Sequence, residues 1–255
     1  MGDNKAKRYF FVFFFEFKKK SIIFAAKIVL RMFRFKHFTI EQELCAMKVG
    51  TDGVLLGAWA NGGSRVLDVG TGTGLIALMM AQRYPQSLLT AVDLDEGAVH
   101  QAQINVEHAA CNRITIIHES VQRLSCLPEH QGRYDAVVCN PPFFIDSLGA
   151  PDEQRRLARH ADMLTYGELM DAAWQLLNDK GELSVVVPFD YRQRMEDEAT
   201  FRGFFAARVC AIKTTISKPA RRFLLAFKKH PCERVHDTMT IGDEKYQKLT
   251  EDFYL

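Results

Sequence analysis

The stretch that most restricts the fold is an apolar run, Arg65–Val69, followed by three closely spaced glycines and a second apolar run from Leu75. The first run predicts a buried strand and the second a helix. Gly70, Gly72 and Gly74 remove side chains where the backbone must approach a ligand closely. The pattern is GxGxG, so the GxGxxG spacing of dinucleotide folds is not met. Strand, glycine turn and helix in this order predict an α/β unit with a nucleotide-like ligand at its edge.

Two acidic side chains strengthen this prediction. Asp68 lies inside the predicted strand, where a buried carboxylate needs partners and either fixes the loop or meets a cationic ligand. Leu88–Asp93 predicts the next strand, and Asp93 at its end is placed like the carboxylates that bind the two hydroxyls of a ribose. Asp95 is the alternative, but it also suits the N-cap of a helix predicted over Glu96–His108. We therefore prefer Asp93 as the ribose ligand.

A second candidate site follows the apolar run Tyr134–Cys139, which predicts a strand buried on both faces. The two prolines after Asn140 stop this strand, so Asn140 is expected at the carboxyl edge of the sheet, where open α/β sheets bind ligands. The Asn140 side chain and the Pro141 carbonyl offer adjacent acceptors for an NH2 group, such as an adenine or guanine amine or a glutamine amide. Phe143 offers a ring for stacking, a contact worth about 1–3 kcal/mol per base. Asn-Pro alone is only a turn signal, but downstream of a glycine turn we interpret the motif as catalytic.

The polar turn before the helix predicted up to Ala60 is a further candidate. Thr51 and Asp52 are good N-cap residues for this helix. A helix N-terminus also offers free N–H groups to a carboxylate, so Thr51 is a candidate cofactor contact, although simple capping explains it equally well. Some group within Glu119–Val121 is expected beside an adenine ring, but the sequence does not decide which.

The remaining periodicity predicts one α/β domain over residues 32–255. The alternation from Arg34 to Ile40 predicts an edge strand or hairpin. Further elements are predicted as strands at Arg113–His118, Glu182–Pro188, Ala206–Thr215 and Phe223–Lys228, and as helices at Tyr166–Leu177 and Asp190–Phe201. The last two strands are close enough to form a hairpin. The sum is a seven-stranded, mostly parallel sheet with one antiparallel strand and helices on both faces.

Charge is distributed unevenly along the chain. Residues 38–201 carry twelve Lys or Arg against twenty-three acids, whereas residues 202–234 carry nine against Glu233 alone. An acidic body with a basic C-terminal third fits a protein that grips a phosphate backbone, although a solvated face explains a charge run as well. Arg221 and Arg222 are therefore candidate RNA contacts. Arg155 and Arg156, in a long polar connection, are others, and helical surface charge explains them equally well.

The six cysteines include no CxxC pair or zinc-like spacing, so we predict reduced thiols, no metal and a cytoplasmic protein. Cys139, although adjacent to Asn140, is expected to pack rather than react. The apolar runs before residue 31 are too short for a membrane helix and do not end like a signal peptide. We interpret residues 1–31, rich in Phe and Lys, as an upstream extension preceding a natural start at Met32.

Taken together, these motifs resemble Rossmann-like S-adenosylmethionine-dependent methyltransferases that act on amino nitrogens. The resemblance within them is to the bacterial tRNA(Val) (adenine-37-N6)-methyltransferase family, and it extends from about Phe35 to the C-terminus. It is carried by the sequence segments Ala46–Trp59, Asn140–Phe144, Arg222–Phe227 and Phe253–Leu255. Residues 1–31 have no counterpart.

The resemblance implies the class I methyltransferase fold, S-adenosylmethionine as cofactor and the tRNA anticodon loop as substrate. Carried over by position, Asp68 and the three glycines contact the methionine end of the cofactor and Asp93 its ribose. Asn140 and Pro141 hold the adenine amine, and Phe143 stacks on its ring. Phe143 replaces the Tyr of some relatives, which leaves no hydroxyl for proton transfer. Ribosomal RNA guanine-N2 and release-factor glutamine-N5 methyltransferases share the turn, and a non-catalytic RNA-binding module is a further alternative. No protein partner is indicated, and we expect a monomer.

Overall fold

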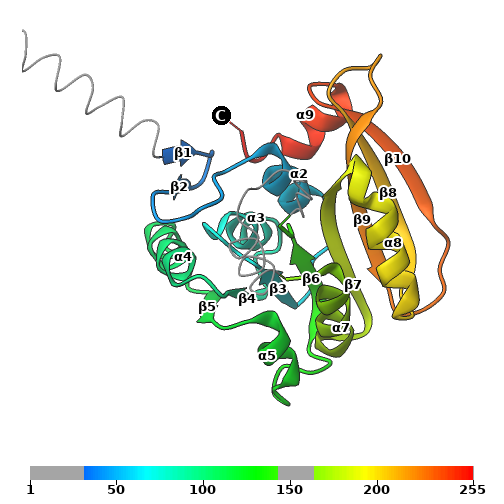
Figure 1. Cartoon of the computed structure of the whole chain (residues 1–255). Helices are drawn as coiled ribbons and strands as arrows, with labels where there is room; N and C mark the ends of the chain where they lie inside the picture. The colour runs from blue at the N-terminus through cyan, green and yellow to red at the C-terminus, as the bar shows by residue number, and fades with distance from the viewer. Residues whose placement is uncertain (1–31, 143–163, 255) are drawn as a thin grey trace, which may run out of the picture.

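A computed structural model describes residues 32–142 and 164–254 of the chain. Its centre is an eight-stranded sheet with the strand order β10-β8-β9-β7-β6-β3-β4-β5 (Figure 1). The strands are β3 (Arg65–Val69), β4 (Leu88–Asp93), β5 (Ile114–His118), β6 (Tyr134–Cys139), β7 (Leu177–Pro188), β8 (Phe205–Lys213), β9 (Ala220–Lys228) and β10 (Val235–Thr240). β9 runs antiparallel to both of its neighbours, β7 and β8, and the other neighbouring pairs are parallel. The strands other than β9 therefore all end at one edge, the carboxyl edge.

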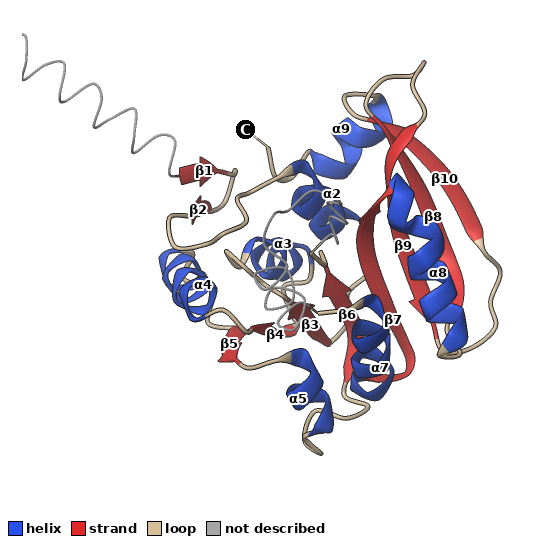
Figure 2. Ribbon diagram, in the orientation of Figure 1, coloured by secondary structure: helices blue, strands red, loops and turns tan. Residues whose placement is uncertain are grey.

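Helices cover both faces of this sheet (Figure 2). One face carries α2 (Thr51–Trp59), α3 (Leu75–Arg83), α4 (Glu96–His108) and α9 (Glu244–Thr250), and the other carries α5 (Val121–Cys126), α7 (Tyr166–Leu176) and α8 (Arg192–Phe201). Successive strand residues face opposite sides, so Val66 packs into the core of the first face and Leu67 into that of the second. Burial on both sides explains why β3 and β6 are nearly all apolar.

The predicted mostly parallel α/β fold with one antiparallel strand is confirmed, but the count of seven strands is wrong. The additional strand is β10, which pairs in parallel with β8 at the edge of the sheet. Five of its six residues are exposed or partly exposed, and Met239 alone is buried. An edge strand needs no continuous apolar run, so the sequence VHDTMT gave no strand signal. The short helices α5 and α9 were also not predicted.

The hairpin predicted near Arg34–Ile40 is confirmed as a small separate sheet of β1 (Met32–Arg34) and β2 (Thr39–Glu41). It packs on the C-terminal segment, because the Lys36 amide donates to the Phe253 carbonyl at 2.9 Å. Phe253 is 1% exposed, and the ring of Phe35 stacks on Tyr254 with centroids 6.2 Å apart. The two ends of the described chain are therefore joined.

Two helix starts test the capping predictions. The Asp95 side chain accepts a hydrogen bond from the Ala98 amide at 2.7 Å and caps α4, as predicted. The expectation that Thr51 or Asp52 caps α2 is wrong. Gly50 is the N-cap and supplies no side chain, and Asp52 instead forms an ion pair with Arg222 of β9.

Candidate active site

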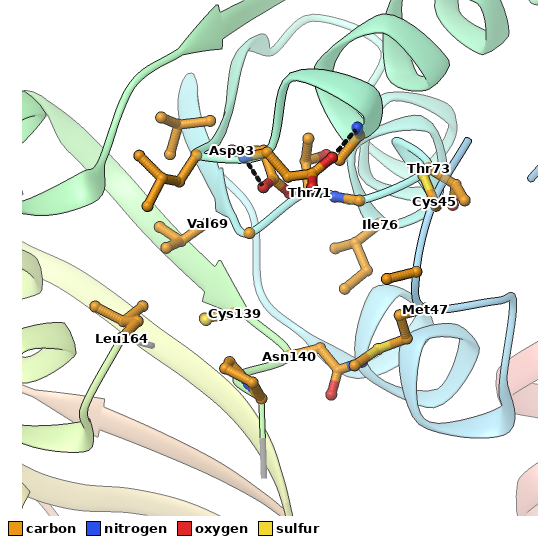
Figure 3. Close-up of a pocket in the computed structure, with 18 of the residues that line it drawn as sticks. Cys45, Met47, Val69, Thr71, Thr73, Ile76, Asp93, Cys139, Asn140 and Leu164 are labelled. Carbon is orange, nitrogen blue, oxygen red and sulfur yellow. Dashed lines mark hydrogen bonds between the residues drawn. The ribbon is translucent and has the colours of Figure 1, made fainter. Parts of the chain in front are cut away.

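A cavity of about 320 Å³ opens at the carboxyl edge of the sheet, at the ends of β3, β4 and β6. This volume lies at the lower end of the range of small-molecule sites. Five segments supply most of its lining, and Figure 3 shows residues from several of them around one space. They are the loop before α2 (45–50), the glycine turn after β3 (69–73), the end of β4 (92–95), the segment after β5 (119–122) and the end of β6 with Asn140 and Pro142.

The glycine turn needs glycine because of its backbone conformation. Gly70 and Gly72 have φ angles of 65° and 55°, in the region that side chains disfavour. A Cβ at either position would meet no atom within 4 Å, and both residues line the cavity. Gly74, with φ of 79°, is the N-cap of α3 and is not among the lining residues. Gly70 and Gly72 thus present bare backbone to open space.

Asp68 fixes this turn from below. It is 1% exposed, and its Oδ2 accepts hydrogen bonds from the Thr71 hydroxyl at 2.6 Å and the Ala77 amide at 3.1 Å. Its Oδ1 has no hydrogen-bond partner within the described residues. Burial, more than its hydrogen bonds or the nearby Asp93, sets its pKa, which is raised to about 7. Of the two roles left open by the sequence, the structure shows that Asp68 fixes the loop. Asp68 does not line the cavity, and its contact with a cationic ligand stays a prediction.

Asp93 lines the cavity at the end of β4. Its Oδ2 accepts from the Gly72 amide at 2.8 Å, and its Oδ1 accepts from the Asp95 amide at 3.0 Å. Each carboxylate oxygen can accept more than one hydrogen bond, so both oxygens retain capacity for a ligand hydroxyl. Asp95 is occupied as a helix cap, and the ribose role of Asp93 stays a prediction.

Asn140 lies directly after β6, on the far side of the cavity from Asp93 (Figure 3). Its Oδ1 is buried and accepts no hydrogen bond from any described residue. Its Nδ2 lies 3.7 Å from the sulfur of Met47, a weak acceptor. Leaving a buried acceptor unpaired costs about 1–3 kcal/mol, so this oxygen is positioned for a donor that the described residues do not supply.

Several other predicted site residues either do not line the cavity or lie outside the described residues. Pro141 is buried next to Asn140 but is not among the lining residues, whereas Pro142 is. Phe143 lies outside the described residues, as do Arg155 and Arg156. Thr51 lies in the first turn of α2, next to Gly50, and does not line the cavity.

The loop before α2 is a cavity wall that the sequence only partly indicated. The Lys48 ammonium donates to the carbonyls of Gln42 and Cys45, and the Gln42 side chain accepts from the Val49 amide at 2.7 Å. These bonds close the loop, which brings Met47 beside Asn140. Polar residues that bond within their own loop leave no periodic signal, so only the part from Met47 onwards was recognised, as a polar turn that enters the helix. Glu119 to Val121, where an adenine contact was expected, do line the cavity, together with Gln122.

The thiols at the cavity are not nucleophiles. Burial raises the pKa of Cys45 to about 11 and that of Cys139 well above its usual range. A nucleophilic cysteine needs a lowered pKa. The interpretation of Cys139 as a packing residue is supported, since it is 1% exposed.

The basic C-terminal segment does not form one continuous cationic surface. Arg202 pairs with Asp171 and Glu198, Arg208 with Glu182, and Arg234 with Glu196. Arg222, predicted to bind RNA, pairs with Asp52. Arg221 is exposed at the start of β9. Most of the charge counted in the sequence is therefore balanced within the fold.

Two further properties concern the described residues alone. In residues 32–142 and 164–254, no group of three His, Cys, Asp or Glu side chains is arranged to hold a metal ion. No helix in the same ranges has the length and apolar character needed to cross a membrane.

The sequence matches the family model described as the methyltransferase small domain over residues 49–206. Fold and cavity thus define a methyltransferase. A predicted O-methyltransferase from Agrobacterium tumefaciens shares the fold, with a TM-score of 0.61 at 16% identity over 79% of this chain and 96% of that one.

Relatives at higher identity define the family. The tRNA1(Val) (adenine(37)-N6)-methyltransferases of Parabacteroides distasonis and Phocaeicola vulgatus are 41% and 42% identical to this chain. That of Trichodesmium erythraeum is 40% identical. Each alignment covers 88% of this chain and 97% of the relative. The chain belongs to the tRNA1(Val) (adenine(37)-N6)-methyltransferase family.

Proposed function

We propose that this chain transfers a methyl group from S-adenosylmethionine to the exocyclic N6 amine of adenine 37 in the anticodon loop of tRNA(Val). The observation that carries the proposal is the buried Oδ1 of Asn140 at the cavity, which has no hydrogen-bond partner within residues 32–142 and 164–254. Family membership supports the substrate, because relatives named for this reaction align with nearly the whole of their length. A tRNA substrate also implies that the protein acts in the cytoplasm.

The cavity suits the cofactor. Gly70 and Gly72 offer close approach to backbone on one side, and Asp93 offers a carboxylate for ribose hydroxyls. When bound, S-adenosylmethionine supplies an electrophilic methyl group on a positively charged sulfur. Asp68 holds the turn against which the cofactor lies, through its bonds to Thr71 and Ala77.

The chain's own contribution to the reaction is orientation of the amine. An adenine amine is a poor nucleophile because its lone pair is delocalised into the ring. The Asn140 Oδ1 and the Pro141 carbonyl accept the two amine hydrogens, which favours a pyramidal nitrogen with its lone pair directed into the cavity. Placing two reactants in line contributes much of such a rate gain. The target base must leave its stack to enter the site, and an anticodon loop makes this inexpensive because its bases are already unpaired.

The experiment supplies tritiated S-adenosylmethionine with tRNA, ribosomal RNA or release factor in parallel, followed by nucleoside analysis. We expect label only in tRNA, as N6-methyladenosine, and no label in a tRNA(Val) transcript with G at position 37. Asn140→Ala should lower transfer about a thousandfold, whereas Asn112→Ala, which changes an exposed asparagine after α4, should not lower it. Label only as N2-methylguanosine, or only in release factor, would overturn the proposal.

A further inference from the structure

Phe189 is an exposed aromatic residue at the same edge as the candidate active site. It directly follows Pro188, the last residue of β7, and β7 is the neighbour of β6 in the sheet. Cys139 pairs with Val185, so Phe189, which begins the short 3-10 helix η1 (Phe189–Tyr191), lies three residues beyond the position on β7 that corresponds to Asn140. At about 3.3 Å per residue, the two positions differ by about 10 Å along the strands, the scale of a dinucleotide.

The Phe189 ring is supported on one side and open on the other. It is 54% exposed. Its centroid lies 6.0 Å from that of Phe223, which is buried in β9. The Arg192 guanidinium lies 4.4 Å from the Phe223 ring and is itself held by Glu196 at 2.7 Å. The Phe189 ring therefore packs at a tilt against the buried Phe223 ring and still presents aromatic surface to solvent.

The β8–β9 hairpin, which lies next to the end of β7, carries cationic residues. The β8–β9 hairpin ends at the carboxyl edge, where Arg222 pairs in register with Pro188. Residues 213–222 contain four Lys or Arg and no acid. Arg222 is taken by Asp52, but Lys218 and Arg221 are exposed and form no ion pair with any residue that the structure describes. Asp190, next to Phe189, is exposed and negative. A phosphate is therefore favoured near Arg221 rather than near Asp190.

We infer that Phe189, Lys218 and Arg221 form a surface that binds the unpaired nucleotide next to the target base and its phosphate. Single-stranded RNA is bound by aromatic rings on which bases stack and by cations that follow the backbone. When the target base leaves its stack, the neighbouring base loses a stacking partner. The Phe189 ring takes the place of that partner. This inference rests on the proposed function, because it assigns the position of the RNA relative to Asn140.

The first test measures the tRNA affinity and methylation kinetics of Phe189→Ala. Loss of one base–aromatic stack should raise the tRNA Kd and KM about tenfold, with cofactor affinity unchanged and kcat at saturating tRNA within about threefold of the parent. Phe189→Trp, which keeps a stacking surface, should restore the parent KM.

The matched control is Phe201→Ala. Phe201 is 85% exposed and has the Arg202 guanidinium 5.5 Å from its ring, but it ends α8 just before the start of β8, at the opposite edge. We expect it to leave the tRNA KM unchanged. An unchanged KM in Phe189→Ala would overturn the stacking role, while continued formation of N6-methyladenosine by that variant would leave the proposed function standing.

The second test measures the salt dependence of tRNA binding. For single-stranded nucleic acid, each lost phosphate contact reduces the slope of log K against log salt by about 0.7. The double variant Lys218→Ala/Arg221→Ala should therefore lower the slope by more than one. Lys180→Ala, which changes an exposed lysine near the start of β7, serves as the control and should not change the slope. An unchanged slope in the double variant would remove the phosphate contacts from the surface.

Discussion

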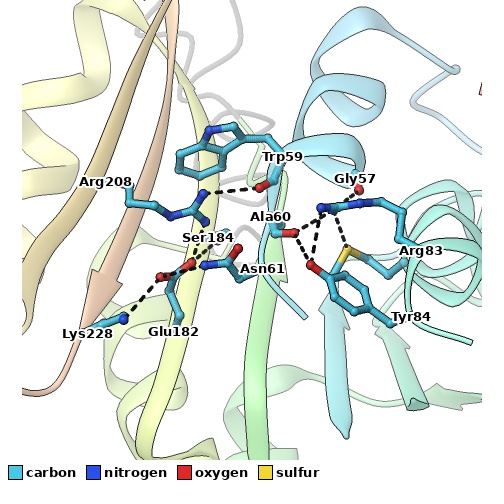
Figure 4. A network of polar contacts seen from close by, with 11 residues as sticks. Gly57, Trp59, Ala60, Asn61, Arg83, Tyr84, Glu182, Ser184, Arg208 and Lys228 are labelled. Atoms are coloured by element: carbon cyan, nitrogen blue, oxygen red, sulfur yellow. Dashed lines mark hydrogen bonds and ion pairs between the residues drawn. The ribbon is translucent and has the colours of Figure 1, made fainter. Parts of the chain in front are cut away.

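Two regions of the sheet differ in how their buried side-chain acceptors are paired. In the amino-terminal half, Glu182 of β7 is 5% exposed and lies among several partners (Figure 4). Arg208 donates to it at 2.6 Å, Asn61 lies at 3.4 Å and Lys228 at 4.0 Å. The Arg208 guanidinium also stacks on Trp59 at 3.9 Å. The network ties β7, β8 and β9 to the end of α2.

At the carboxyl edge, buried acceptors are left without such partners. Asn140 Oδ1 and Asp68 Oδ1 accept no hydrogen bond from the described residues. Glu182 is thus paired about midway along β7, whereas one oxygen of Asp68 and one of Asn140, at the carboxyl ends of β3 and β6, have no partner among the described residues. The difference indicates that the amino-terminal half serves stability and the carboxyl edge serves binding.

The sharpest test of this contrast is Asn140→Ala. Loss of a preorganised hydrogen-bonding group at a reacting centre costs about 10²–10³ in rate, so we expect kcat/KM for methylation to fall about a thousandfold, or about 4 kcal/mol. Thermal stability should stay the same or rise, because an unpaired acceptor is removed. Methylation assays with thermal melts check both. A melting temperature lowered by several degrees would show that Asn140 is structural.

Asp68→Asn tests the raised pKa of the second buried group, Asp68. The folded-state pKa of Asp68 is raised to about 7 from 3.8, so the folded state holds this proton more tightly than the unfolded state. The stability of the parent therefore falls as pH rises through this window and levels off above it. Relative to the parent, the Asn variant should gain about 3 kcal/mol between pH 5 and pH 8. Urea unfolding across this range measures the gain, and parallel curves for the two proteins would disprove the raised pKa.

Glu182→Ala tests the other half of the sheet. Removing one partner of a buried pair leaves the other charge uncompensated and costs about 3 kcal/mol, since Arg208 is itself largely covered. Glu182→Gln should cost less because it keeps the hydrogen-bonding atoms. Unfolding free energies give the result. The kcat of the folded fraction should be unchanged, and a large loss of kcat without loss of stability would reverse the assignment.

The smallest effect is expected for the Asp52–Arg222 pair, which joins the start of α2 to β9. Both side chains are 24% exposed, so a double-mutant cycle of Asp52→Asn and Arg222→Gln should give a coupling free energy of about 1 kcal/mol. The same cycle with Arg221→Gln should give none. A coupling near zero for Arg222, together with weaker tRNA binding, would return Arg222 to the RNA-binding residues.

Regular, buried elements could be predicted from the sequence, and residues defined by their partners could not. Helix α4 was predicted with its observed bounds, Glu96–His108, because its cap and periodicity are local. The exposed edge strand β10 was missed because burial on one side leaves no apolar run. Arg222 looked like an RNA contact because its partner, Asp52, lies 170 residues away in the sequence. The acceptor at Asn140 was predictable from the prolines that end its strand.

The junction of Lys36 with Phe253 has a practical consequence. Phe253 is buried in the fold, and the Phe35 and Tyr254 rings stack on each other beside it. A tag that displaces Phe253 would break its hydrogen bond with Lys36. Loss of Phe253 would likewise loosen the hairpin of β1 and β2, which leads into the cavity loop. Purification handles are therefore better attached through a flexible linker.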